Sequence, residues 1–439
     1  MKKRAMFISN EPDVLTLPLS FLLPIIFLSL MATPSAVYCD SWQPIGPEGG
    51  NFIFSMTNPM NANEVTAITT SPSPSNVYRS SDGGISWNEI GEIPYPYISD
   101  VSAYDLSTIY AISSSRCYRS TDGGINWTEA RLPTSSGWAY FVRAHPTDSS
   151  IVYVAGYFSD YRSYPYTYSM VFFKSTDGGL NWSASPFFTF DSFYPYDMAI
   201  SESNPSVIYV SGRKEVGNES VGALLKTADG GSTWTDISSS VDTERYSLFQ
   251  SIAIDPTDEN KVYVGGSAFY RSISEGRGHE LLWERSPERL NAYHIKVDPV
   301  EPSRIYATGY QSINVSSDYG QTWRTYSGCT RNVARHIEVT QADPSRIYAS
   351  SNTGLYKSLD SGATWDIAHD GIYAARIAAL ATTPSTVIVQ NSGYLMAYDR
   401  RGRTTAWHDL VTPESCGEVC DILINPDDPD TVIILEGYG

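Results

Sequence analysis

The stretch STDGGINW, residues 120–127, recurs almost unchanged as STDGGLNW at residues 175–182. The same pattern returns as SSDGGISW (80–87), TADGGSTW (227–234), SSDYGQTW (316–323) and SLDSGATW (358–365). Its central aspartates are Asp82, Asp122, Asp177, Asp229, Asp318 and Asp360, separated by 40, 55, 52, 89 and 42 residues. The step of 89 spans two units, so it predicts a degenerate copy in RSISEGRGHELLW, residues 271–283. A second degenerate copy is YDRRGRTTAW, residues 398–407, and the chain is therefore a repeat array.

A second motif runs in phase with the first. Segments such as IAIDPTDENKVYVGG (252–266) and IKVDPVEPSRIYATG (295–309) precede the boxes. Each reads as an alternating run, a Pro/Asp turn and a β-branched, Tyr-rich run, which together predict two strands and a hairpin. The residues flanking each box supply two more strands. Four strands per unit of about 40 to 50 residues is typical of a propeller blade, so the predicted fold class is all-β, a single β-propeller.

The composition agrees with this fold and excludes one class of partner. The chain has 439 residues, 13% of them aromatic, with 32 Gly and 26 Pro, which suits short strands joined by tight turns. The formal net charge is -18 at pH 7. Proteins that bind nucleic acid concentrate Lys and Arg on one face, so a nucleic-acid partner is not expected.

The repeated aspartate is better explained as a structural bracket than as a catalyst. In the pattern S-x-D-G-G-x-x-W, glycine permits positive φ in a tight turn, and the carboxylate accepts hydrogen bonds from turn N–H groups. The Trp is expected to pack beside the next sheet. A catalytic group is needed once, whereas a turn bracket is needed in every blade.

These boxes resemble the Asp-box, or BNR, repeat of sialidases, sortilin-type receptors, xyloglucan-hydrolysing propeller enzymes and photosystem II assembly and stability factors. The DP-x-x-P-x-x-(V/I)Y hairpins combined with STDGG-x-x-W look most like the last two groups and their uncharacterised secreted bacterial relatives. The resemblance covers residues 41–439 and implies the fold, because the shared motif is the structural one.

The resemblance transfers few functional residues. The Arg-Ile-Pro motif of sialidases does not occur in the sequence. Xyloglucanases place two aspartates in a cleft between two propellers, whereas this chain has units for one. The assembly factors are single propellers that bind a protein partner, which fits the length. We therefore expect a binding or scaffold propeller that engages a protein or glycan partner, with no cofactor and no metal.

The number of blades follows from counting units. Eight complete units begin near Phe52, Val101, Phe141, Met198, Ile252, Ile295, Ile337 and Ile377. A ninth begins at DILINPDDPDTVIILEG, residues 421–437, and stops before its box. The segment SWQPIGPEGG, residues 41–50, looks like a fourth strand that would complete this ninth blade and close the ring. The alternative is an eight-bladed ring with an unpaired tail.

The first 36 residues read as a secretory signal. A positively charged start, MKKR, precedes an apolar run over residues 15–32 and the small residues before the expected cleavage near Ala36. Left uncut, the apolar run would serve as a single membrane span. Cleavage is favoured, which predicts a secreted or periplasmic monomer without a membrane span, whose propeller covers residues 41–439.

Ligands of propellers often bind where first strands begin, at the mouth of the central channel. The aromatic residues expected there include Phe52, Phe249 and Tyr373, and the candidate binding residues are Tyr97, Tyr140, Tyr196, Tyr293, His294, Arg335, His336 and Arg376. An exposed Tyr presents a flat apolar face and a polar tip, which suits stacking on sugars or anchoring a protein.

The alternative function is a glycoside hydrolase acting on a polysaccharide such as xyloglucan. It needs two carboxylates about 5 to 10 Å apart. The weak catalytic candidates are Asp100, Asp197, Glu338 and Asp421, which start or lie in first strands of different units. No two of the six histidines are close enough in sequence to form a ligand-spaced pair, so no metal site is predicted. The alternative that stays open is a site assembled from histidines of different blades.

Overall fold

A computed structural model of the chain describes residues 4–8, 16–18, 49–71, 75–94, 98–134, 137–160, 167–183, 188–191, 193–217, 219–241, 248–273, 282–288, 290–327, 334–351, 354–368, 373–374, 377–382, 386–391, 394–399, 408–409, 418–424 and 432–437. The chain divides into two compact units. One is formed by residues 49–374, and the other combines residues 1–48 with residues 375–439. All of the long elements described are β-strands.

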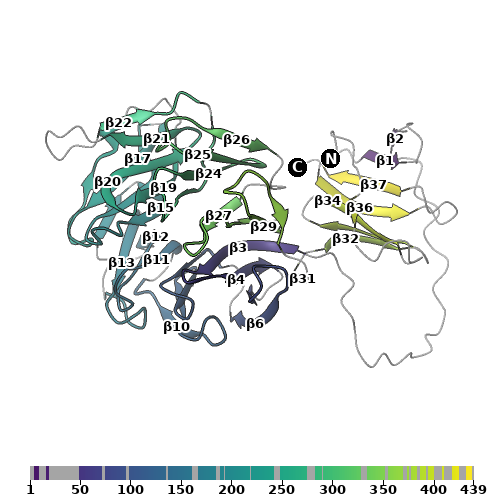
Figure 1. The fold of residues 1–439 in the computed structure, drawn as a ribbon, viewed down its shortest axis with the longest axis horizontal. Coiled ribbons are helices and arrows are strands. Elements are labelled where there is room, and N and C mark those ends of the chain that lie inside the picture. Colours follow the sequence, from purple (N-terminus) through teal and green to yellow (C-terminus); the bar gives the residue numbers. More distant parts are fainter. Residues whose placement is uncertain are drawn as a thin grey trace. The chain divides into compact units, whose positions relative to one another are not determined.

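Residues 49–374 form a β-propeller of seven sheets arranged around a channel (Figure 1). Each sheet is an antiparallel meander of four consecutive strands. The first three blades are β3 (Gly49–Asn58), β4 (Asn61–Ser71), β5 (Ser75–Ser80) and β6 (Asn88–Ile93); β7 (Asp100–Ala103), β8 (Ile109–Ser113), β9 (Arg116–Ser120) and β10 (Thr128–Arg131); and β11 (Gly137–Ala144), β12 (Val152–Asp160), β13 (Thr167–Ser175) and β14 (Phe188–Asp191).

The other four blades repeat this arrangement. They are β15 (Phe193–Ile200), β16 (Ile208–Val216), β17 (Glu219–Thr227) and β18 (Thr235–Asp236); β19 (Phe249–Asp255), β20 (Asp258–Gly266), β21 (Phe269–Ile273) and β22 (Leu282–Arg285); β23 (Ile295–Val297), β24 (Ile305–Gly309), β25 (Ser312–Ser316) and β26 (Arg324–Ser327); and β27 (Ala334–Val339), β28 (Ile347–Ser351), β29 (Gly354–Ser358) and β30 (Asp366–Ile367). A 3-10 turn, η2 (Ser238–Ser240), follows β18. The degenerate box predicted at residues 271–283 coincides with the third and fourth strands of the fifth blade.

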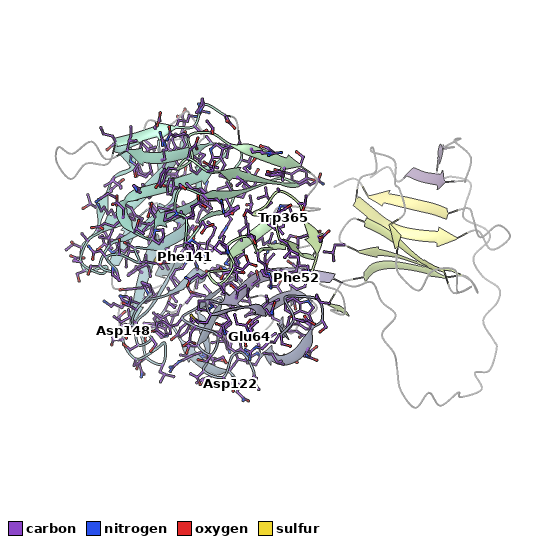
Figure 2. The ribbon with its side chains drawn as sticks, viewed as in Figure 1. Phe52, Glu64, Asp122, Phe141, Asp148 and Trp365 are labelled. Atoms are coloured by element: carbon purple, nitrogen blue, oxygen red, sulfur yellow. The ribbon has the colours of Figure 1, made fainter. Side chains whose placement is uncertain are left out.

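The position of a strand within its blade decides its burial. The second strands β8, β24 and β28 are buried at every residue, because a neighbouring blade covers each face of the sheet. The fourth strands β10 and β26 are mostly exposed. In Figure 2, Phe141 of a first strand lies inside the propeller, whereas the turn residues Asp122 and Asp148 lie at its margin.

Each Asp box is a closed turn in which the carboxylate accepts several hydrogen bonds. Asp122 accepts from the main-chain N–H groups of Ile125 and Asn126, at 3.1 and 2.9 Å. It also accepts from the Ser120 hydroxyl at 2.9 Å and from the Asn126 side chain at 2.7 Å. The same hydrogen bonds in the first blade, from Ser86 above all, hold the pKa of Asp82 well below its usual range. These contacts are internal to each turn.

The box also fastens the turn between the first and second strands of its own blade. The residue after the Asp donates its N–H to a carbonyl in that turn, as from Gly83 to Asn63 at 2.9 Å and from Gly123 to Ser107 at 2.8 Å. In two boxes this residue is not glycine. Ser361 has a φ of 60° and still donates to Ser345 at 2.9 Å. The contact therefore holds a non-glycine residue in the left-handed region.

Apolar clusters between neighbouring blades hold the ring together. The cluster between the first two blades contains Val77 from one and Tyr118 from the other, and Trp127 of the second Asp box packs against it. In the first box the Trp87 indole N–H donates to the carbonyl of Ala368, in the seventh blade, at 2.7 Å. Each Trp thus packs on the preceding blade. The expectation that it lies beside the next sheet is wrong, because the box folds back toward the previous blade.

The ring closes after seven blades. Phe52 and Tyr348, from the first and seventh blades, share one buried cluster. The Lys357 ammonium of the seventh blade donates to the carbonyl of Gly83 in the first, as the Arg79 guanidinium of the first donates to Gly123 in the second. Figure 1 shows β3 beside β27 and β29. The prediction of eight or nine blades in one ring is wrong, because direct packing of the seventh sheet on the first leaves no position for another.

The remaining predicted units form sheets of the second compact unit. The eighth forms β32 (Ile377–Thr382), β33 (Thr386–Asn391), β34 (Tyr394–Asp399) and β35 (His408–Asp409). The ninth gives β36 (Glu418–Ile424) and β37 (Val432–Gly437), and β37 pairs with β1 (Arg4–Ile8), which pairs with β2 (Thr16–Pro18). The segment 41–50 does not complete this sheet in the described residues, because Gly49 and Gly50 begin β3 of the first blade.

Two further features concern the ends of the propeller. A short strand, β31 (Tyr373–Ala374), pairs in parallel with the start of β3 and widens the first sheet. Within the described ranges, no helix has the length and apolar character needed to cross a membrane. The signal sequence expected at residues 1–36 stays a prediction.

Replacing Ser361 by Gly is expected to stabilise the protein by about 0.5–1 kcal/mol, because glycine removes the left-handed strain while the Ser345 contact remains. The reciprocal variant Gly123→Ser should destabilise it, since a Cβ there would lie 2.8 Å from the carbonyl oxygen of Leu106. Urea denaturation of both variants measures the effect. A Ser361→Gly variant less stable than the wild type would contradict this account.

Candidate binding face and channel

A β-bulge recurs at one position in the first strands of the propeller. The pairing register shifts at this position in the first, third, fourth, fifth and seventh blades. The residues that the shifts leave unpaired with the second strand are Ile53, Tyr140, Tyr196, Gln250 and Arg335. Side chains of a strand normally point to its two faces in turn. A bulge inserts an extra residue, whose side chain departs from this alternation. All five residues line the same cavity, the mouth of the central channel.

Two cavities lie along the channel among the residues that the structure describes. The cavity where first strands begin, which we name the start face, has a volume of about 480 Å³ and is lined by residues from the first-strand segments of all seven blades. The cavity at the opposite end, the turn face, has a volume of about 350 Å³ and includes Tyr104, Asp105 and Glu202 in its lining. Met56, Lys296 and Glu338 line both cavities, so they lie where the two approach each other.

The start face gathers some of the predicted binding residues. Tyr140 and Tyr196 are 41% and 39% exposed, Arg335 is exposed, and Tyr293 is half-buried in the same lining. Burial, with the nearby Tyr194 and Tyr196, raises the pKa of Tyr140. Four aromatic and basic side chains therefore surround one opening.

Some of the predicted binding positions do not lie at the mouth of the channel, and others lie outside the described residues. Phe52 and Phe249 are buried between blades, because the bulge places the next residue of each strand at the mouth. Tyr373 lies in β31. Tyr97 and Arg376 lie outside the described residues.

The third and fourth blades carry an aromatic group that the sequence analysis did not identify. Trp138 is 61% exposed and pairs across strands with Tyr157. Tyr157 stacks on Tyr194 with 4.3 Å between ring centroids, and the Arg213 guanidinium lies 4.5 Å above the Tyr194 ring. The hairpins here are long, with nine residues in β12, β13, β16 and β17 against five in β24, β25, β28 and β29. The sequence signal for this aromatic group was the wide spacing of the boxes in the third and fourth units, 55 and 52 residues, which accommodates the longer strands.

Two of the candidate carboxylates share one guanidinium. Arg143 contacts Asp100 of the second blade and Asp197 of the fourth, each at 2.5 Å. Each carboxylate also accepts a main-chain N–H from the following blade, Asp100 from Val142 at 3.0 Å and Asp197 from Ile252 at 3.1 Å. The three charged groups therefore tie four consecutive blades together around the channel.

Burial and charge shift the pKa of Asp100 and of Arg143. Burial raises the pKa of Asp100, and Arg143 opposes that rise only in part. Burial also disfavours the charged form of Arg143, but the two carboxylates outweigh it and raise the pKa of the guanidinium. The arginine is thus a permanent cation between the two acids.

The remaining carboxylate candidates are also accounted for in structural terms. Glu338 accepts from the Lys296 ammonium of the sixth blade and the Thr57 hydroxyl of the first, both at 3.3 Å. It therefore bridges three blades. Asp421 lies in β36 of the second compact unit. Three of the four candidates lie in the propeller, and each of these makes polar contacts between blades.

Two histidines lie side by side deeper in the start face. The rings of His294 and His336, in adjacent blades, are 5.3 Å apart between centroids, and Phe54 lies 4.7 Å from His336. Burial lowers the pKa of His294 to about 4 and that of His336 well below its usual value, with Lys296 and Arg143 adding to both effects. Both rings are therefore neutral at pH 7. Among the described residues, no three metal-ligating side chains converge.

Comparisons with known proteins agree with the repeat and the fold. The family model for the BNR/Asp-box repeat matches residues 118–129. A structure of YCF48 bound to D1 peptide is 14% identical, covers 71% of this chain and 94% of its own, and has a TM-score of 0.51. An outer coat vertex of COPII on membranes is 11% identical over 83% of this chain and 99% of its own, with a TM-score of 0.54.

A GH74 enzyme of Niastella koreensis is 17% identical over 85% of this chain and 67% of its own, with a TM-score of 0.47. No curated protein sequence matches the chain. At such identities, the likeness to the first two structures shows the propeller fold alone.

Replacing Arg143 by Leu is expected to destabilise the propeller by about 3 kcal/mol, because two largely desolvated carboxylates lose their counter-charge. The control Arg116→Leu removes a more exposed pair with Glu129 and should cost less than about 1 kcal/mol. Adding Asp100→Asn and Asp197→Asn to Arg143→Leu should recover part of the loss. Urea denaturation distinguishes these cases, and equal losses for both arginines would contradict a structural role for the triad.

The histidines predict a loss of stability in acid. The unfolded chain takes up protons on both histidines near pH 6.5. In the folded chain the pKa of His294 is about 4 and that of His336 lies well below its usual value. Their stabilisation is therefore complete above pH 6.5 and falls as the pH drops, by at most about 1.4 kcal/mol per pH unit for each histidine. Denaturation at pH 7 and 4.5 should show a smaller loss for a His294→Phe/His336→Phe variant than for the wild type. An identical loss would exclude the pair as its cause.

Proposed function

We propose that this chain, a β-propeller built from BNR/Asp-box repeats, is a non-catalytic binding protein that engages a protein or glycan partner through its start face. The observation that carries the proposal is the recurring bulge. It turns one side chain of most first strands toward a shared opening and places Tyr140, Tyr196 and Arg335 there. A partner would meet aromatic faces and one charge on a rigid ring.

The chemistry of the rim favours binding. A Tyr buries a large, rigid surface at low entropic cost and keeps a polar hydroxyl for hydrogen bonding. Trp138, beside the stacked rings of Tyr157 and Tyr194, extends the aromatic surface along the third and fourth blades. The stack is already formed without a partner, so little side-chain freedom is left to lose on binding.

The carboxylates argue against the alternative, a glycoside hydrolase. A hydrolase needs one protonated acid and one free carboxylate. The raised pKa of Asp100 would suit the acid, which is the one observation that favours this alternative. Asp197, however, accepts from Arg143 and from the Ile252 N–H, so a nucleophile or base would have to leave both partners.

The proposed setting follows from the amino-terminal segment. Residues 1–36 carry the charge and apolar pattern of a secretory signal, which supports a secreted or periplasmic monomer. In such a compartment the partner would be a surface glycan or an exported protein.

The test is a binding panel with rim variants and a matched control. Purified protein would be titrated against soluble polysaccharides, including xyloglucan, and against a library of unstructured peptides, by calorimetry. Tyr140→Ala and Tyr196→Ala should each weaken binding about tenfold or more. Tyr104→Ala removes a tyrosine of similar exposure, 36%, from the turn face and should leave binding unchanged.

Two outcomes would contradict the proposal. A partner that binds with equal affinity to both rim variants would place the binding surface elsewhere. Release of reducing ends from a polysaccharide, abolished in a folded Asp197→Asn variant, would make the protein a hydrolase.

A further inference from the structure

The His294 and His336 pair has a feature that neither the fold nor the proposed partner binding requires. Both Nδ1 atoms are buried, and neither has a hydrogen-bond partner among the described residues. In the equivalent positions of the second and fourth blades, Asp100 and Asp197 each satisfy a main-chain N–H of the next blade. Buried ring nitrogens are nearly always paired, so two adjacent orphans call for a bound water or ion.

The spacing of the rings fits one shared ion. A first-row metal binds imidazole nitrogen at about 2.0–2.1 Å, which puts the ring centroid about 3.2 Å from the metal. Two such rings with centroids 5.3 Å apart subtend an angle of about 110° at the metal, which is the tetrahedral angle.

We propose that His294 and His336 form a binding site for a transition-metal ion, of the Zn²⁺ class, in the start-face cavity. Each imidazole supplies one nitrogen, and water completes the coordination shell. The inference is independent of the proposed partner, because it uses none of the rim tyrosines.

The charges around the pair permit a cation. Both imidazoles are neutral at pH 7, as a metal ligand must be. The two nearby cations are compensated, Lys296 by Glu338, and Arg143 by two carboxylates. Arg335, the exposed neighbour of His336, is the remaining cation in the lining and lies at the mouth.

The ligand set indicates which ions bind and how tightly. Imidazole nitrogen suits Zn²⁺, Cu²⁺, Ni²⁺ and Co²⁺, whereas Mg²⁺ and Ca²⁺ prefer oxygen. Two protein ligands give a weaker site than the four of a structural zinc centre, so we expect micromolar rather than nanomolar affinity. The Phe54 ring, tilted against that of His336, keeps one side of the site apolar and so limits access of water to the ion.

The experiment is calorimetric titration of the purified, chelator-treated protein with ZnCl₂ at pH 7, with Co²⁺ absorption as a second readout. One tight ion per chain is expected, with weaker binding to the many surface carboxylates. The folded variants His294→Phe and His336→Phe keep an aromatic ring in place and should each weaken the tight site at least about tenfold. The control His145→Phe replaces a histidine of the third blade, near Tyr153, and should leave it unchanged.

The Co²⁺ complex of the wild type should show the intense visible bands of a four-coordinate ion, and the two variants should lack them. If either variant does not fold, His294→Gln and His336→Gln serve the same purpose. The proposal is overturned if wild type and variants bind Zn²⁺ equally, or if the wild type has no site tighter than its surface carboxylates. A buried water would then explain the two orphaned nitrogens. Partner binding, measured separately in metal-free buffer, fails or succeeds independently of this result.

Discussion

The packing of each blade's buried second strand against its two neighbours is the constraint on which the rest of this structure depends. A strand such as β8, buried along its whole length, is covered only when sheets lie on both sides of it. The array therefore cannot end in an open row without exposing two apolar faces, and closure between Phe52 and Tyr348 removes both. Closure also creates the channel, because it points seven first strands at one axis. The Asp boxes, the inter-blade cations and the carboxylate bridges all act on an arrangement that this apolar packing has already set.

Much of the ring was predictable from the sequence because the local pattern repeats. The spacing of Asp82 and Asp122, the DP hairpins and the degenerate fifth copy predicted the strands correctly. The number of blades in the ring was not predictable, because the eighth unit has the same local pattern and also forms a four-stranded sheet. The ring ends at the seventh blade because one face of its sheet packs on the sheet of the first blade. The sequence did contain one signal for contact between blades. The residue before most boxes is a Lys or Arg, such as Arg79 or Lys357, and its side chain donates to the box of the next blade.

The site was predicted less completely than the fold. Asp100 and Asp197 were identified as candidate acids, but the sequence gives no sign that Arg143 lies between them, since the three come from three different blades. Their meeting depends on ring geometry, which local patterns do not encode. The bulges were missed for a related reason. An extra residue in a strand is defined by its partner strand, so the sequence placed Phe52 and Phe249 at the mouth, one residue too early.

The many tyrosines illustrate why position within the repeat matters more than composition. Tyr110, Tyr209 and Tyr348 occupy one position of the second strand and are fully buried, and the first two hydroxyls donate to carbonyls of the next blade. These residues build the ring and are constrained to stay aromatic. The bulge position is less constrained, because its side chain lines the channel cavity in the blades that have the bulge, and only Ile53 among these five residues is also buried in a cluster between blades. The bulge position holds different residue types from blade to blade. Two positions later the side chain is buried in every blade, and these residues are Ser55, Val101, Val142, Met198, Ile252, Ile295 and Ile337. The residue type at the bulge can therefore differ between blades without loss of the fold, which is why we place the proposed partner binding at these positions.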